Sequence, residues 1–123
     1  MNILGISCFY HDSAAALLQS GKLVAAAEEE RFSRWKHDNR FPHRAIEFCL
    51  EQTGIDACDL DYVVFYEKPL RKFERALLTG LATFPRAWLS LGEATIAWLG
   101  GKLWIRERIH EHLAIQRNKI LFV

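Results

Sequence analysis

The chain has 123 residues, of which 50% are hydrophobic and 25% are charged, and its formal net charge is +1. This balance is typical of one packed domain and excludes an intrinsically disordered chain. A net charge so close to zero gives no overall field that would attract nucleic acid or an anionic membrane. Any attraction for anions must therefore be local.

Three cysteines, Cys8, Cys49 and Cys58, show no C-x-x-C spacing, which argues against a disulfide framework and against a structural zinc site. We therefore expect a reducing compartment and a cytoplasmic protein without a secretory leader. The apolar region from Ala76 to Ile105 contains charges and a proline before about 18 uncharged residues accumulate. We expect buried helices there, and no membrane span.

Three short apolar runs open the chain, at residues 2–7, 14–19 and 22–27. Between the second and third runs stand only Ser20 and Gly21. A two-residue connection that ends in glycine is typical of a tight β-hairpin. The sequence therefore predicts three consecutive antiparallel strands.

A helical pattern follows Pro42, a residue that helices accept at their start because its missing N–H has no partner there. Apolar residues recur at helical spacing, and Gly54 provides a stop. These apolar positions are Ala45, Ile46, Cys49 and Leu50. The next run, residues 61–66, is rich in β-branched and aromatic side chains, which predicts a strand buried on both faces. After a crossover helix, this strand should run parallel to one already in the sheet.

From residue 70 to about residue 117 the pattern is helical, with breaks at Pro85 and at 100–101, so we expect two or three helices. Residues 120–123 indicate one more buried strand, and the sequence stops inside it. We therefore expect the chain to be an N-terminal fragment of a longer protein. Residues 31–41 resemble a linker.

His11 and Asp12 follow the first strand, at the mouth of a tight connection. Imidazole titrates near neutral pH, and an adjacent carboxylate can tune it or bind a hydroxyl group, so the pair suits proton transfer. Asp12 and Ser13 can also simply cap the turn with side-chain hydrogen bonds, which leaves His11 as a surface residue. The spacing alone does not choose between these interpretations.

A cationic cluster follows the acidic residues 28–30 and is interleaved with aromatic side chains. Its members are Arg31, Arg34, Lys36, Arg40 and Arg44. Guanidinium groups bind phosphate oxygens in pairs, so the cluster suits an anionic ligand such as a nucleotide or an acyl phosphate. A solvated loop that exchanges ion pairs with the glutamates is the alternative. The adjacent acidic run argues against nucleic-acid binding.

His110 and His112 are two residues apart, so on a helix they point to different faces and do not share one metal ion. We interpret them as a polar helix end. The tryptophans Trp88, Trp98 and Trp104 suit a core or a partner interface. A non-catalytic interaction module that docks through these helices is therefore an alternative function, and a nucleotide-binding sensor domain is another.

Two segments resemble the N-terminus of the O-carbamoyltransferases of nodulation-factor and antibiotic tailoring. They are residues 11–17, HDSAAAL, and residues 28–38, EEERFSRWKHD, and the opening ILGIS of residues 3–7 agrees with them. The resemblance extends over essentially the whole chain and is strongest from Asn2 to Gly54. Two ordered motifs at the expected separation make it fairly specific.

The resemblance implies an α/β fold, the ribonuclease-H-like mixed sheet of actin-like ATPases, with residues 1–123 as its N-terminal part and a helical insertion at about 70–117. It implies an ATP-dependent enzyme that moves a carbamoyl group from carbamoyl phosphate, through carbamoyl-adenylate, to an acceptor hydroxyl. His11 would then be the general base, with Asp12 orienting it or contacting the acceptor. Arg31, Lys36 and His37 would shape the substrate site.

The resemblance also implies an iron or other divalent metal ion in the full-length enzyme. The family's H-x-x-x-H motif follows a strand like residues 120–123, so we expect the metal ligands outside this chain, and His110 and His112 do not replace them. We expect the isolated fragment to be inactive and its partners to be the remainder of the same protein and small molecules. No nucleic acid and no membrane are expected.

Overall fold

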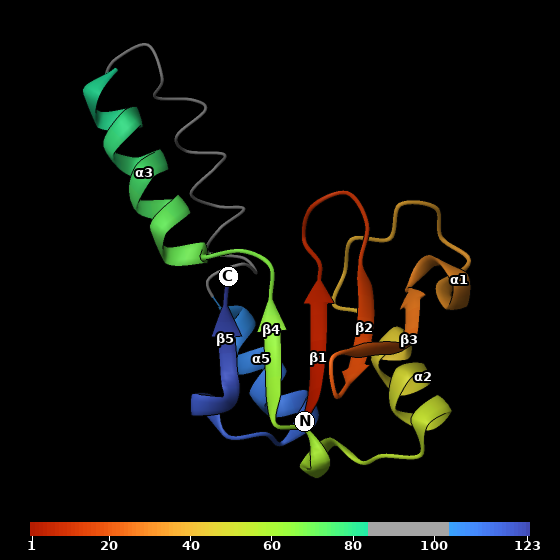
Figure 1. Cartoon of the computed structure of the whole chain (residues 1–123). Helices are drawn as coiled ribbons and strands as arrows, with labels where there is room; N and C mark the ends of the chain where they lie inside the picture. The colour runs from red at the N-terminus through yellow and green to blue at the C-terminus, as the bar shows by residue number, and fades with distance from the viewer. Residues whose placement is uncertain (84–103) are drawn as a thin grey trace.

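The computed structural model describes residues 1–83 and 104–123. Five strands form one mixed sheet in the order β3-β2-β1-β4-β5 (Figure 1). They are β1 (Asn2–Ser7), β2 (Ala14–Gln19), β3 (Lys22–Glu28), β4 (Tyr62–Phe65) and β5 (Ile120–Phe122). β2 is antiparallel to both β1 and β3, whereas β4 is parallel to β1 and β5 is parallel to β4. The expected α/β fold with a mixed sheet is confirmed, including the parallel strand after the crossover helix.

The turn between β2 and β3 explains how the first three strands form so locally. Ser20 and Gly21 both have left-handed backbone, with φ of 50° and 80°. A two-residue turn with positive φ at both positions matches the right-handed twist of the strands that it joins. The predicted hairpin is therefore confirmed in position and in kind.

The helices of the described residues are α1 (Glu30–Ser33), α2 (His43–Thr53), α3 (Pro69–Ala82) and α5 (Ile105–Leu113), with single 3₁₀ turns η1 (Ala57–Asp59) and η3 (Arg117–Lys119). Two of them, α2 and α5, cover one face of the sheet (Figure 1). Helix α2 ends at Gly54, whose φ of 65° suits glycine. The core combines strand residues with the apolar stripes of α2 and α5, and includes Leu4, Leu17, Ile46, Cys49, Val63, Phe65, Ile105 and Ile109.

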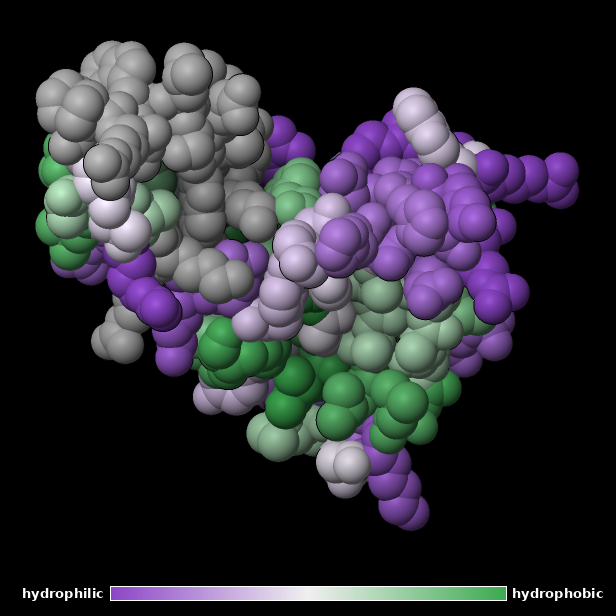
Figure 2. Space-filling model, turned by 90° about the horizontal axis from the view of Figure 1, so that it is seen from above, coloured by the Kyte–Doolittle hydropathy of each residue, from purple (hydrophilic) through white to green (hydrophobic). Residues whose placement is uncertain are grey.

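The opposite face of the sheet carries exposed apolar side chains. Figure 2 shows green hydrophobic residues gathered on one side of the molecule. Tyr62 and Tyr66 are 39% and 40% exposed, whereas Val63 and Phe65 are fully buried. The expectation that this strand is buried on both faces is therefore wrong for the structure described. β5 differs from its expected burial in the same way, since Ile120 is buried while Leu121 is 41% exposed.

The helical region after β4 is confirmed at its two ends, by α3 and α5. The break expected at Pro85 and the tryptophans Trp88 and Trp98 lie outside the described residues, and Trp104 is exposed. In the described ranges, no helix has both the length and the apolar character that crossing a bilayer requires. All three cysteines are free, with only Cys58 exposed.

The segment expected to be a linker, residues 31–41, is packed structure. It begins within α1, and it contains the buried side chains of Asp38 and Phe41. Its polar groups bond to the connection between β1 and β2, which a composition-based interpretation does not detect. This packing places the candidate site.

Candidate functional site

Two connections meet at the end of the sheet where β1 leads into β2. The Phe9 amide donates to the Asn39 carbonyl oxygen at 2.7 Å. The amide and the hydroxyl of Ser13 donate to the Asp38 carbonyl oxygen at 2.8 and 2.9 Å. Because Ser13 and Asp38 are buried, the two bonds from Ser13 lie away from solvent, and all three bonds hold the loop before α2 against the connection.

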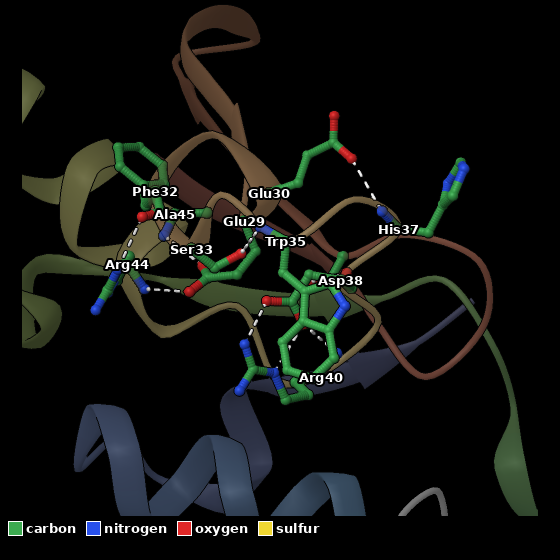
Figure 3. A network of polar contacts seen from close by, with 11 residues as sticks. Glu29, Glu30, Phe32, Ser33, Trp35, His37, Asp38, Arg40, Arg44 and Ala45 are labelled. Atoms are coloured by element: carbon green, nitrogen blue, oxygen red, sulfur yellow. Dashed lines mark hydrogen bonds and ion pairs between the residues drawn. The ribbon is translucent and has the colours of Figure 1, made fainter.

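This docking brings Asp12 next to His37, which is 25 residues away in the sequence. The Nδ1 atom of His37 lies 3.0 Å from Oδ1 of Asp12. The His37 amide donates to Oε2 of Glu30 at 3.1 Å (Figure 3). His37 has a left-handed φ of 57° and its side chain is 66% exposed. A carboxylate beside an exposed imidazole can fix its tautomer and orientation.

The other residues expected in the site lie on the same two connections. His11 is exposed, and its ring packs on that of Tyr10 with centroids 4.0 Å apart. The side chains of Arg31 and Lys36 are exposed, and neither forms an ion pair within the part of the chain that the structure describes. The structure therefore joins Asp12 to His37 by direct contact and leaves His11, Arg31 and Lys36 facing solvent.

Asp38 is a buried carboxylate that sequence reasoning included only as part of a motif. Arg40 binds it through two parallel bonds, Nε to Oδ1 at 2.9 Å and Nη2 to Oδ2 at 2.7 Å, and the Arg40 amide adds a third at 3.1 Å. These bonds from Arg40 hold the pKa of Asp38 far below its ordinary value, against the opposing effect of burial. The Arg40 guanidinium also lies over the Trp35 ring, 5.0 Å from its centroid.

Glu29 is the second buried carboxylate, and its role was not predicted. Its oxygens accept the amides of Arg44 at 3.3 Å and Ala45 at 2.9 Å, in the first turn of α2 (Figure 3). Pro42 stands at the N-cap position, where it supplies no side-chain acceptor. A helix without a side-chain cap at its start needs an acceptor from elsewhere in the chain. The proline at the N-cap position was therefore the sequence signal that could have pointed to such an acceptor.

Asp12, Glu30 and His37 each offer one ligand atom, and these atoms lie within 4.8 Å of one another. The set could hold a divalent cation. Asp56, Cys58 and Asp59 form a second such group, fully on the surface. Exposed acidic groups commonly meet in proteins without an ion, and nothing further in the structure points to a metal at either place.

The two histidines of α5 have separate partners, as their spacing predicted. His110 lies with Nδ1 2.7 Å from the Ile115 carbonyl oxygen, just beyond the helix. His112 meets His43 of α2, with their Nδ1 atoms 3.2 Å apart and their ring centroids 4.5 Å apart. The edge of the Phe41 ring packs against His112. This histidine pair links the start of α2 to the end of α5.

We expect the His43–His112 pair to make stability fall as the solution is acidified from pH 7.5 to 5.5. Burial and the neighbouring His43 lower the pKa of His112 from 6.5, although Glu47 and Glu29 oppose them. The unfolded chain then binds more protons below about pH 6.5, so stability is lost as the pH falls through that value. Urea unfolding across this range measures the slope, and His112→Gln should flatten it. An unchanged slope in the variant would contradict the expectation.

Comparison with known proteins settles the family. The family described as "Carbamoyltransferase N-terminus" matches residues 2–121. The chain belongs to this family. The expectation from the two sequence motifs is therefore confirmed for the carbamoyltransferase N-terminus. Residues 11–13 of the first motif and 29–38 of the second lie on the two connections that meet at the site.

Two relatives of this carbamoyltransferase N-terminus are much longer than the chain. The uncharacterized protein sll1178 of Synechocystis sp. is 52% identical over 113 residues, which are 92% of this chain and 18% of that protein. Nodulation protein NolNO of Sinorhizobium fredii is 47% identical over 58 residues, or 47% of this chain and 8% of that protein. The chain thus matches less than a fifth of the length of either relative.

Among solved structures, YeaZ from Pseudomonas aeruginosa aligns with a TM-score of 0.40 and 17% identity, covering 56% of this chain and 31% of that chain. This likeness is too distant to carry an argument. The fold class of the carbamoyltransferase N-terminus rests on its own strand order and strand directions.

Proposed function

We propose that this chain forms the N-terminal part of an ATP-dependent O-carbamoyltransferase. The enzyme moves the carbamoyl group of carbamoyl phosphate, through carbamoyl-adenylate, to the hydroxyl of a small-molecule acceptor. The observation that carries the proposal is the family match over residues 2–121. The position of both sequence motifs on two docked connections at one end of the sheet supports it.

His11 is the proposed general base. The acceptor oxygen attacks the carbamoyl carbon, the bond from that carbon to the adenylate phosphate oxygen breaks, and AMP leaves. The acceptor proton passes to the His11 imidazole, the kind of side chain that most often serves as a general base. The exposure of His11 supports this role, since an acceptor can reach the ring.

Asp12 and His37 are proposed to position the acceptor together. The 3.0 Å contact between the Asp12 carboxylate and the His37 imidazole leaves one carboxylate oxygen and Nε2 to bind acceptor hydroxyls. Arg31 and Lys36 supply positive charge to the same region, which suits a substrate that carries phosphate. Both side chains are exposed and free to reorient toward such a substrate.

The iron or other divalent metal expected for the full-length enzyme does not fit the two histidines of α5, His110 and His112. His110 lies against the Ile115 carbonyl and His112 against His43, so the two rings do not face one ion. We propose that the remainder of the longer protein supplies that site and the carbamoyl-phosphate chemistry, and that residues 1–123 alone are inactive.

The proposal is tested by His11→Asn in the full-length protein. We expect carbamoyl transfer to a hydroxyl acceptor to fall by about 10²–10⁴-fold, the usual contribution of a general base. Carbamoyl-adenylate formation, followed as pyrophosphate release from ATP, should stay near the wild-type rate. The two steps are measured separately, with a panel of sugars as acceptors for the transfer step.

Lys22→Gln is the control, because Lys22 is exposed and lies beyond the hairpin turn at the far end of β2 from the site. It should leave both steps unchanged. Normal transfer by His11→Asn would remove His11 from the mechanism. Loss of adenylate formation as well would show that His11 acts before transfer.

A further inference from the structure

A cavity of about 470 Å³ lies on the helix-covered side of the loop that follows α1. The β1–β2 connection, the end of β3, this loop, the first turn of α2 and α5 all contribute to its wall. The lining residues that matter below are Phe9, Glu29, Asp38, Arg40, Arg44 and Arg108. None of the five residues expected in the carbamoyl-transfer site belongs to this wall. The volume is within the range of small-molecule sites.

The acidic groups of the wall are already engaged. Both oxygens of Asp38 accept bonds from the Arg40 side chain, and both oxygens of Glu29 accept amides at the start of α2 (Figure 3). These carboxylates therefore stabilise the walls of the cavity and do not occupy the guanidinium groups of Arg44 and Arg108. The wall carries three arginines, Arg40, Arg44 and Arg108, against these two carboxylates.

Two cations of the wall remain available to a ligand. Arg44 uses Nη1 to donate to the Phe32 carbonyl oxygen at 2.8 Å, which fixes the guanidinium and leaves its other N–H groups. Arg108 lies over the Phe9 ring, with Cζ 5.4 Å from the centroid. Neither arginine pairs with an acidic side chain in residues 1–83 or 104–123. They come from α2 and α5, so they reach the cavity from two separate elements.

We infer that this cavity binds the phosphate group of a small molecule through Arg44 and Arg108. A guanidinium group binds two oxygens of one anion in a parallel pair. A carboxylate has two oxygens in a single plane, whereas a phosphate has at least three terminal oxygens in a tetrahedral arrangement, so a phosphate can face two guanidinium groups from different directions. Two arginines on separate elements therefore favour a phosphate over a carboxylate. This site is distinct from the one proposed for carbamoyl transfer, and it does not use His11.

The test is calorimetric titration of the chain with inorganic phosphate, with acetate at equal ionic strength as the comparison. We expect phosphate to bind and acetate not to bind. Arg108→Gln should weaken phosphate binding at least about tenfold, because a charge-assisted pair is lost. Arg106→Gln is the matched control: Arg106 is also exposed on α5 and lies over an aromatic ring, Phe122, but is not part of the wall.

Further titrations identify what carries the phosphate. Glucose 6-phosphate binding where glucose does not would indicate a phosphorylated small molecule, and ATP binding more tightly than inorganic phosphate would indicate a nucleotide. His11→Asn should bind phosphate like the wild type. Failure of the phosphate-site inference can therefore be distinguished from failure of the carbamoyl-transfer proposal. Equal binding of phosphate and acetate, or equal loss in the Arg106 and Arg108 variants, would overturn the inference.

Discussion

Replacing Glu29 by alanine is expected to lower the free energy of unfolding by about 1–3 kcal/mol, the cost of leaving buried backbone donors without an acceptor. The side chain is only 6% exposed, so water does not easily replace its oxygens at the amides of Arg44 and Ala45. The negative charge of the carboxylate also interacts favourably with the positive end of the α2 dipole. Urea unfolding, followed by circular dichroism, measures the loss.

Glu28→Ala is the matched control, since Glu28 is the adjacent glutamate and its side chain is exposed. It should change stability by no more than about 0.5 kcal/mol. Glu29→Gln should fall between the two, because the amide keeps one acceptor oxygen but turns an NH₂ group toward N–H donors. Equal stability of the Glu28 and Glu29 variants would show that the cap contributes nothing to stability.

Asp38→Asn is expected to cost about 1–2 kcal/mol and to loosen the candidate site. This cost in stability is at the lower end of the range for hydrogen bonds to a buried charged group, because the Arg40 side chain is 61% exposed and water screens the ion pair. With Arg40 released, the loop should open more often. The Phe9 and Ser13 amides, which donate to the loop, should then exchange with solvent about tenfold faster in hydrogen-exchange measurements.

The same pair gives a second, independent signature in acid. Because Arg40 lowers the pKa of Asp38 in the folded state, its stabilisation is complete above the ordinary value of 3.8 and is lost as the pH falls below it. The variant should lose that part of the acid dependence. Glu51→Gln, a substitution at an exposed position of α2, should change neither the exchange rates nor the loss of stability at acid pH. Unchanged exchange at Phe9 and Ser13 in Asp38→Asn would contradict the role given to the ion pair.

The fold was largely predictable because its signals are local. Ser20 and Gly21 are adjacent, and the apolar stripe that ends at Gly54 repeats within one helix. Such patterns depend on backbone geometry and on side-chain periodicity, which neighbouring residues determine. Burial of a strand on both faces is different. The apolar run of β4 indicates what the strand tolerates, and not whether both of its faces are covered.

The candidate site was predictable only in part, because its contacts are long-range. His11, Asp12 and His37 were chosen as residues, but the sequence did not indicate that Asp12 would contact His37 and leave His11 exposed. That outcome depends on the left-handed backbone at His37 and on two bonds to the Asp38 carbonyl oxygen. The cap by Glu29 spans 15 and 16 residues, and no short-range pattern encodes it.

Three non-glycine residues near the site share an uncommon backbone: Phe9, Arg34 and His37 have φ of 64°, 56° and 57°. Each left-handed residue costs about 1–2 kcal/mol relative to an ordinary conformation. A peptide copied from either connection would therefore relax to another shape and lose the arrangement of its side chains. Anyone transplanting this site to a different scaffold would have to move both connections together with the ion pair and the cap that hold them.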